Sequence, residues 1–185
     1  MERNIMMAGF GGQGVLTMGK LLSQATTDST DLNVTFFPAY GAAMRGGTSN
    51  CYVVISDMEI AEPISDQVDD LIVMNDLSLH KYLSTLRKGG TLYVNSSIIK
   101  EPIGRDDVTV IEVPVTEMAL EMGNPRALNF IMLGVYIGFS EAVPAKVITA
   151  GIHHKFEGKP KVIESSNNAF KSGLAIGRSK KEGNA

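Results

Sequence analysis

Three closely spaced glycines near the N-terminus constrain the fold of this chain more than any other feature. Gly9, Gly11 and Gly14 follow a short apolar run at residues 5–8 and precede a segment, starting at Val15, whose apolar residues recur at helical spacing. This order predicts a strand, a glycine turn and a helix. Backbone N–H groups and the helix dipole at such a turn can hold an anionic group.

The spacing of these glycines matches the dinucleotide-binding fingerprint, but the rest of that site is missing. A nicotinamide site also needs an acidic residue at the end of the second strand, about 20 residues further on. The second predicted strand ends at Pro38, and the nearest carboxylates, Asp28 and Asp31, precede it. Three interpretations stay open: a dinucleotide site, a tight turn that lets helix and sheet pack closely, and a surface presented to another subunit or its ligand. The Gln13 amide can bond to backbone or to ligand.

A second glycine-rich loop follows the second predicted strand, at residues 40–50. It lies at the C-terminal side of that strand, the edge where ligands bind in parallel α/β sheets. Its small residues, including Gly46 and Gly47 beside Thr48, suggest close approach by another backbone. Arg45 can clamp a phosphate or a carboxylate, or else form a solvent-exposed or intersubunit ion pair.

Strands alternate with helices in the first two thirds of the chain, and helical spacing dominates after Val115. Strands are predicted at residues 5–8, 34–37, 49–56, 71–74, 91–95 and 108–113, with a hairpin from 49 to 61. A helix is predicted at 79–86, capped by Asp76 or Ser78 and closed by Gly89 and Gly90; later helices start at Pro144 and Lys161 and stop at Gly158 and Gly177. This pattern predicts an α/β fold with a mostly parallel, doubly wound sheet, an antiparallel hairpin and a helical C-terminal third. We expect one domain over residues 1–177 and a disordered tail over 178–185.

Charge and cysteine content exclude several classes of function. The chain carries 17 Lys and Arg against 20 Asp and Glu, so it offers no broad basic surface to nucleic acid or anionic lipid. No segment reaches the roughly 18–20 consecutive apolar residues of a membrane span. Cys51 is the single cysteine, whereas an iron–sulfur cluster needs about four protein ligands. We therefore expect no nucleic-acid or membrane partner, no cluster held by this chain alone, and a cytoplasmic location.

No group of residues has the spacing of a catalytic site or a metal site. His153 and His154 are adjacent, so on a helix their side chains diverge by about 100°. Asp69 and Asp70 are expected to be solvated or to cap an element rather than to form an acid–base pair. Cys51, in a strand rich in Val and Ile, is expected to be an inert, buried thiol. We expect neither a catalytic residue nor a metal ligand in this chain.

Residues 127–139 form a predicted helix that is apolar around most of its circumference, with Gly134 and Gly138 four residues apart. The helix is too short to cross a bilayer. It must therefore be buried, either in the core of this domain or partly beneath a partner. Asn129 is its lone polar residue and needs a hydrogen-bond partner there.

Four motifs, taken together, resemble the gamma subunit of 2-oxoacid:ferredoxin oxidoreductases. They are Gly-Phe-Gly-Gly-Gln-Gly at 9–14, Tyr-Gly-x-x-Met-Arg-Gly-Gly-Thr-Ser-Asn-Cys at 40–51, Gly-Thr-Leu-Tyr-Val-Asn-Ser-Ser at 90–97, and Gly-Asn-x-Arg-x-x-Asn at 123–129 followed by Met-Leu-Gly at 132–134. The resemblance covers residues 4–177. The wording of the first two motifs is closer to the 2-oxoglutarate and branched-chain enzymes than to the pyruvate enzymes. Ala42 and Ala43 depart from the Pro-Glu pair expected before Met44, which weakens any role that needs a carboxylate in this loop.

The resemblance implies a Rossmann-like, three-layer domain in an enzyme that decarboxylates a 2-oxoacid to an acyl-CoA and reduces ferredoxin. Thiamine diphosphate and the iron–sulfur clusters are then carried by partner alpha and beta subunits, with an optional ferredoxin-like delta subunit, and coenzyme A is a co-substrate. The implied ligand-contacting residues are Gly9, Gly11, Gly12, Gln13, Gly14, Arg45, Gly46, Gly47, Thr48 and Asn129. We expect the isolated chain to be inactive and to form a homodimer. Two rival hypotheses are an NAD(P)-binding dehydrogenase module and a purely structural subunit.

Overall fold

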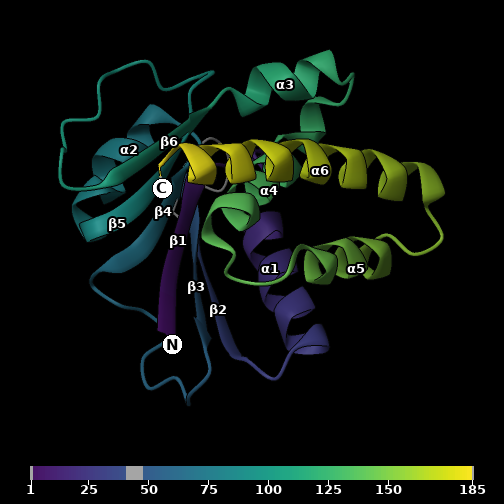
Figure 1. Cartoon of the computed structure of the whole chain (residues 1–185), viewed down its shortest axis with the longest axis horizontal. Helices are drawn as coiled ribbons and strands as arrows, with labels where there is room; N and C mark the ends of the chain where they lie inside the picture. The colour runs from purple at the N-terminus through teal and green to yellow at the C-terminus, as the bar shows by residue number, and fades with distance from the viewer. Residues whose placement is uncertain (1, 41–47, 185) are drawn as a thin grey trace.

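A mixed β-sheet forms the centre of the fold in the computed structural model, which describes residues 2–40 and 48–184 (Figure 1). In those residues the sheet has six strands: β1 (Glu2–Phe10), β2 (Asn33–Tyr40), β3 (Thr48–Ser56), β4 (Val68–Val73), β5 (Leu86–Asn95) and β6 (Thr109–Val113). Their spatial order is β2-β3-β1-β4-β5-β6. Strands β1, β4, β5 and β6 run parallel to one another, and β3 runs antiparallel to both of its neighbours, β1 and β2.

The antiparallel part of the sheet differs from the predicted hairpin over residues 49–61. Strand β3 pairs with β2 on one side and β1 on the other, and no strand forms at Ile60 and Ala61. Cys51, Val53 and Ile55 on β3 are buried in the same core as the first helix, and Val54 is buried on the opposite face. A strand buried on both faces satisfies its backbone best in the interior of a sheet. Strand β3 accordingly pairs on both sides. Its partner in the antiparallel hairpin is the preceding strand, β2, and not residues 60–61.

Helices cover both faces of the sheet, so the three-layer α/β prediction is confirmed. Helices α1 (Val15–Ser29), α4 (Leu128–Ser140), α5 (Ala145–Lys155) and α6 (Pro160–Gly183) pack on one side, and α2 (Asp76–Tyr82) packs on the other with the 3₁₀ turn η1 (Leu83–Thr85). Helix α3 (Val115–Glu121) and the turn η2 (Pro125–Ala127) connect β6 to α4. Among the described helices, none is long and apolar enough to cross a membrane.

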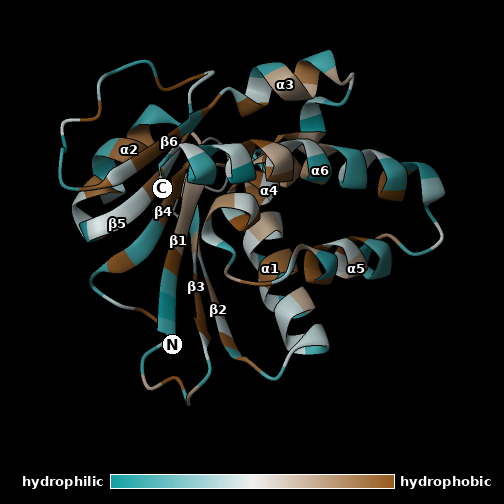
Figure 2. Cartoon of the chain, viewed as in Figure 1, coloured by the Kyte–Doolittle hydropathy of each residue, from teal (hydrophilic) through white to brown (hydrophobic). Residues whose placement is uncertain are grey.

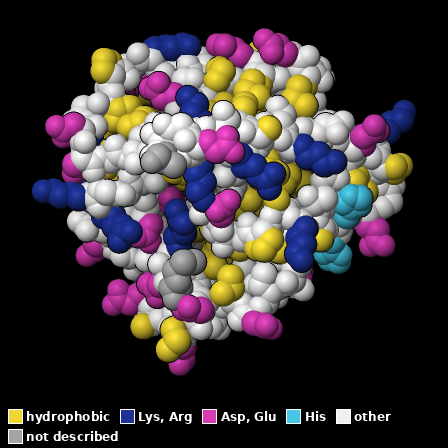
Figure 3. All heavy atoms as spheres, in the orientation of Figure 1, with side chains coloured by type: hydrophobic (Ala, Val, Ile, Leu, Met, Phe, Trp, Pro, Cys, Tyr) yellow, Lys and Arg dark blue, Asp and Glu magenta, His cyan; other side chains and the backbone are white. Residues whose placement is uncertain are grey.

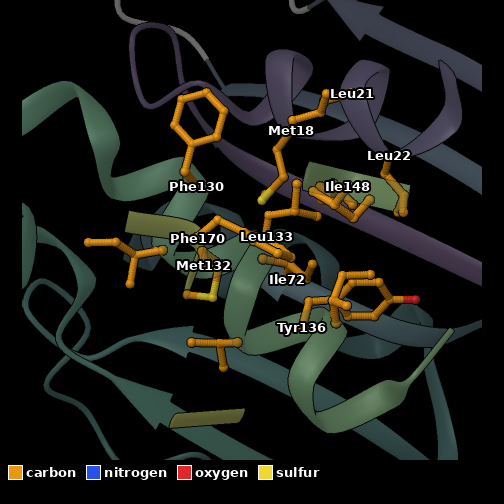
Figure 4. Packing of buried hydrophobic residues seen from close by; sticks show 14 of the residues in the cluster. Met18, Leu21, Leu22, Ile72, Phe130, Met132, Leu133, Tyr136, Ile148 and Phe170 are labelled. Atoms are coloured by element: carbon orange, nitrogen blue, oxygen red, sulfur yellow. The ribbon is translucent and has the colours of Figure 1, made fainter. Parts of the chain in front are cut away.

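Alternating residues of the central strands divide the core into two clusters. Ile5 and Met7 of β1 face the α1 side, whereas Met6 and Ala8 face the α2 side. Figure 4 shows residues of the larger cluster gathered from α1, α4, α5 and α6, among them Met18, Leu22, Leu133, Ile148 and Phe170. In Figure 2 much of β2 and β3 is brown (hydrophobic), whereas the visible turns of α6 are mostly teal and white.

Helix α4 lies inside this core, which settles where the predicted apolar helix is buried. Ten of its residues, from Asn129 to Gly138, are buried within this chain. Helix α6 crosses it so closely that a Cβ atom at Gly173 would overlap the Ile131 carbonyl and one at Gly177 would overlap the Val135 carbonyl. The predicted helix end at Gly177 is wrong, because Gly177 is needed for this contact in the middle of a continuing helix. Residues 178–183, where a disordered tail was expected, form the last turns of α6.

Gly89 and Gly90 lie inside β5 rather than closing the preceding helix. Gly89 has a φ of 73°, in the left-handed region that favours glycine, and a Cβ atom at Gly90 would lie 2.8 Å from the Asp69 carbonyl oxygen. The register of β4 against β5 shifts at this point, between Val68 and Asp70. The two glycines therefore form an irregularity in the sheet, and the helix ends earlier, at Tyr82.

Candidate functional site

The glycine turn lies where β1 ends and α1 begins, at the carboxyl edge of the parallel strands. A Cβ atom at Gly9 would come within 2.7 Å of Val15 Cγ2 and 3.0 Å of Met74 Cβ. Gly14 is the N-cap of α1 with a φ of 74°, and a Cβ atom there would lie 2.7 Å from Asn129 Nδ2. These two glycines therefore allow the close packing of helix, sheet and α4 that one of the three interpretations required.

Gly11 and Gly12 form the exposed part of the turn. A Cβ atom at either position would meet no other atom within 4 Å, and Gly12 has a φ of 98°. No side chain caps the N-terminus of α1, and its first turn holds no acidic residue. The turn thus presents bare backbone beside the positive end of a helix dipole, which can accept an anionic group.

Gln13 points into the protein, and both ends of its carboxamide are bonded within the chain. Its Oε1 accepts hydrogen bonds from the Phe10 backbone N–H (2.7 Å) and from Asn75 Nδ2 (3.0 Å). Its Nε2 donates to the Met74 carbonyl oxygen (3.0 Å). Of the two roles left open for this amide, bonding within the chain is the one that the structure describes.

Two asparagines that were not predicted as site residues join Gln13 at this edge. Asn75 follows β4, and Asn95 ends β5. Asn95 Nδ2 donates to the Met74 carbonyl (3.3 Å) and to Thr116 Oγ1 of α3 (2.9 Å). Asn75 Oδ1 accepts from the Ser78 N–H (2.9 Å) and so caps α2; the predicted caps, Asp76 and Ser78, are wrong. The signal available in the sequence was an Asn at the end of each apolar run, after residues 71–74 and 91–94.

Asn129 reaches the glycine turn from the start of α4, far away in the sequence. Its side chain is 4% exposed, and its Nδ2 donates to the Gly14 carbonyl oxygen over 3.4 Å. Its Oδ1 is buried and has no hydrogen-bond partner among the described residues. The structure therefore brings together Gly14 and Asn129, two of the predicted site residues, and leaves an acceptor free beside them.

The second predicted loop is described only at its end. Arg45, Gly46 and Gly47 lie outside the described residues. Thr48 begins β3, where it pairs with Phe10 at the end of β1 and is partly buried. Thr48 therefore stands next to the glycine turn.

Cys51 and Asp70, two further residues with reactive or ionisable side chains, both lie in the protein interior. Cys51 is fully buried beside Gly19, and burial raises the pKa of its thiol to about 12; the predicted burial of this thiol is confirmed. Asp70 is also fully buried, which contradicts the expectation of a solvated or capping residue. It forms an ion pair with Arg3 of β1 and lies 3.4 Å from the Tyr136 hydroxyl.

The histidines do not converge on a common ligand. His80 pairs with Glu101 (3.0 Å), and His153 contacts the Asn167 amide (3.1 Å). Within residues 2–40 and 48–184, no three His, Cys, Asp or Glu side chains are grouped so that they can hold a metal ion. On the face shown in Figure 3, acidic and basic side chains are mixed rather than separated by sign.

Comparison with known proteins gives consistent relatives. Residues 4–176 match the family model described as pyruvate ferredoxin/flavodoxin oxidoreductase. The chain is 35% identical to the ketoisovalerate oxidoreductase subunit VorA of Methanothermobacter marburgensis over 183 residues, which cover 98% of this chain but 38% of VorA. It is 31% identical to the 2-oxoglutarate synthase subunit KorC of the same organism, over 95% of this chain and 97% of KorC.

Solved structures share the fold. The gamma subunit of a keto/oxoacid ferredoxin oxidoreductase from Geobacter sulfurreducens superposes with a TM-score of 0.84 at 22% identity, over 97% of this chain and 98% of that one. The 2-oxoglutarate:ferredoxin oxidoreductase from Magnetococcus marinus, solved with 2-oxoglutarate, coenzyme A and succinyl-CoA bound, gives a TM-score of 0.88 at 22% identity. That match covers 96% of this chain and 31% of the longer one.

Proposed function

The chain belongs to the pyruvate ferredoxin/flavodoxin oxidoreductase family, and on that premise we propose that it is the gamma subunit of a CoA-acylating 2-oxoacid:ferredoxin oxidoreductase. The enzyme oxidatively decarboxylates a 2-oxoacid to an acyl-CoA and reduces ferredoxin. One observation carries the proposal: the chain matches nearly the whole length of a 2-oxoglutarate synthase subunit at 31% identity.

The proposed substrate of the assembled enzyme is 2-oxoglutarate. Support comes from KorC, which the chain matches along 97% of its length, whereas it spans 38% of the ketoisovalerate subunit VorA. A sequence similar to this chain thus makes up almost the whole of KorC but only part of the longer VorA chain. That occurrence supports a module that works beside other subunits or domains.

Redox cofactors are proposed to sit on the partner alpha, beta and delta subunits. Thiamine diphosphate supplies the decarboxylation chemistry, and iron–sulfur clusters carry the electrons to ferredoxin. The residues of this chain do not suit a cluster, because its one cysteine, Cys51, is buried in the core with a raised pKa. A cluster needs about four thiolate ligands.

This chain's own contribution is proposed to be at the coenzyme A side of the reaction. The exposed backbone of Gly11 and Gly12 and the uncapped start of α1 suit an anionic group such as a CoA phosphate. Gly9, Gln13, Gly14 and Asn129 then shape the turn from behind, while Thr48 stands beside it. Arg45, Gly46 and Gly47, next to Thr48 in the sequence, are proposed as further contacts.

Reconstitution tests the proposal. The chain alone should be inactive, and addition of its partner subunits should give CoA-dependent reduction of ferredoxin or of a viologen dye. Full activity of the partners without this chain would overturn the proposal. Titration of the isolated chain with NADH and with CoA distinguishes this proposal from the dehydrogenase hypothesis, which requires that the chain bind NADH.

Self-association of the isolated chain stays a prediction with less support than the sequence suggested. It rested in part on an uncovered apolar helix, and that helix, α4, is buried within this chain. Sedimentation of the isolated chain measures its oligomeric state directly.

A further inference from the structure

Hydrogen bonds of the Gln13 side chain connect the glycine turn to the residues after β4. Within the turn, the Gln13 N–H donates to the Phe10 carbonyl (3.1 Å), and the Gln13 side chain returns to the Phe10 N–H (2.7 Å). The exposed glycines at 11 and 12 have no side chain with which to fix themselves. The position of the turn relative to β4 and β5 therefore depends on what fixes the Gln13 carboxamide.

Two groups after β4 fix that carboxamide. The Met74 carbonyl accepts from Gln13 Nε2 (3.0 Å), and Asn75 Nδ2 donates to Gln13 Oε1 (3.0 Å). Met74 is in turn held by its N–H to the Ala8 carbonyl (2.9 Å) and by Asn95 on its own carbonyl (3.3 Å). Asn75 is 1% exposed, so no bulk water competes with its bond to Gln13.

These bonds allow the Gln13 amide only one orientation. Rotating it by 180° would place Oε1 against the Met74 carbonyl oxygen and Nε2 against two donors, the Phe10 N–H and Asn75 Nδ2. Every one of these contacts would pair like with like, and buried unpaired groups are costly. Asn75 also caps α2 through its other atom, Oδ1, so one side chain connects the start of α2 to the glycine turn.

We propose that Asn75 is a positioning residue for the CoA-facing turn, and that it acts through Gln13. The inference rests on the proposed function of that turn. Asn75 itself lies behind the turn, and its amide sets where the Gly11 and Gly12 backbone stands relative to the sheet edge.

Asn75→Ser is the test variant, because Ser is also a good N-cap but lacks the Nδ2 donor. Asn75→Asp is the second variant, because it also caps well but sets an acceptor against Gln13 Oε1. Asn33→Ser is the matched control: Asn33 Nδ2 also donates one hydrogen bond, to the Met58 carbonyl (3.0 Å), at the far end of the sheet.

The measurements are made on the assembled oxidoreductase. In the Asn75 variants, hydrogen exchange at the Phe10 and Gln13 amides should accelerate about five-fold, the effect of one neutral hydrogen bond. The KM for CoA should rise by a similar factor, while kcat at saturating CoA and the KM for the 2-oxoacid stay within two-fold of wild type, roughly the scatter of a surface change. The Asn33 control should change none of these.

A double-variant comparison shows whether Asn75 acts through Gln13. Gln13→Met removes both ends of the carboxamide at similar volume and should accelerate exchange by itself. Adding Asn75→Ser to Gln13→Met should then have no further effect on exchange at Phe10. Additive effects, or an Asn75→Ser variant with wild-type exchange, would overturn the inference. If Gln13→Met speeds exchange while the KM for CoA stays unchanged, the positioning stands and the proposed role of the turn in CoA binding fails.

Discussion

Asp70 on β4 forms an ion pair with the partly exposed Arg3 on β1, beneath the C-terminal end of α4. Asp70 is fully buried, and Arg3 Nη2 donates to Asp70 Oδ1 over 3.1 Å while Nη1 donates to the Ser140 carbonyl over 3.3 Å. Burial raises the pKa of Asp70 against the opposing effect of Arg3. Burial by itself lowers the pKa of Arg3, but Asp70, Tyr136 and Tyr93 together outweigh it, so the pKa is raised.

Removing one partner of this pair should strongly destabilise the chain. Arg3→Met leaves a buried carboxylate without its cation, and breaking a buried pair in this way costs about 3–5 kcal/mol. The free energy of unfolding in urea measures this loss. The double variant Arg3→Met/Asp70→Leu should recover most of it, because no unpaired charge remains. A loss below about 1 kcal/mol in the single variant, the size of a surface pair, would contradict the buried pairing.

The Cys51 thiol should make stability fall at alkaline pH. Its pKa is raised by burial from 9.0 to about 12 in the folded chain. Below pH 9 the thiol is protonated in both states and adds no pH dependence. Between pH 9 and about 12 the unfolded chain loses this proton while the folded chain keeps it, so stability decreases by up to about 1.4 kcal/mol per pH unit. Cys51→Ala should remove this part of the slope in urea titrations.

The same burial predicts that a thiol reagent labels Cys51 in urea but not in the folded chain at pH 8. The thiol is fully buried and protonated at that pH, and the thiolate is the reactive form. Rapid labelling of the folded chain would show that the core around β3 opens readily.

Gly173→Ala should destabilise the α4–α6 contact. The added methyl group would overlap the Ile131 carbonyl, and overpacking of a core typically costs about 1–3 kcal/mol. Gly183→Ala on the same helix is the matched control, since a Cβ atom there meets nothing within 4 Å. Thermal unfolding of both variants should show a lower melting temperature for the first and an unchanged or higher one for the second.

Gly11→Ala separates an external role of the glycine turn from an internal one. The position has free space and no left-handed backbone, so its unfolding free energy should stay within about 0.5 kcal/mol of wild type. Gly9→Ala should be destabilising because the added methyl group would overlap the side chains of Val15 and Met74. If the turn contacts CoA or a partner subunit, Gly11→Ala should lower CoA-dependent activity of the assembled enzyme despite its intact fold. Wild-type kinetics would remove Gly11 from the proposed site.

Local sequence patterns predicted the parts of the fold that depend on neighbouring residues. The order of β1, glycine turn and α1, the start of α5 at Pro144 and the buried character of Cys51 all follow from short-range spacing. Element ends were less predictable: Gly177 has the composition of a helix stop, but its small size serves α4 instead.

Features that depend on distant residues were not predicted. The position of β3 between β2 and β1 cannot be predicted without knowing which strands pair. Likewise, nothing in the sequence around Asp70 indicates that it pairs with Arg3, which lies 67 residues away. In the candidate site, the sequence indicated the turn and Asn129. The hydrogen bonds of Asn75 to Gln13 and of Asn95 to Met74 depend on the pairing of β4 with β5 and are visible only in the structure.

The interior position of β1 constrains how the chain acquires its structure during synthesis. Residues 2–10 are synthesised before both of their strand partners, β3 and β4, at residues 48–56 and 68–73. Until β3 and β4 have emerged, the apolar residues 5–8 have no paired strand on either side. Such long-range strand pairing is slow, and the waiting strand is exposed to aggregation. Nascent chains shorter than β4 should therefore depend on a holding chaperone, a requirement that ends once Val73 is available to pair with Ala8.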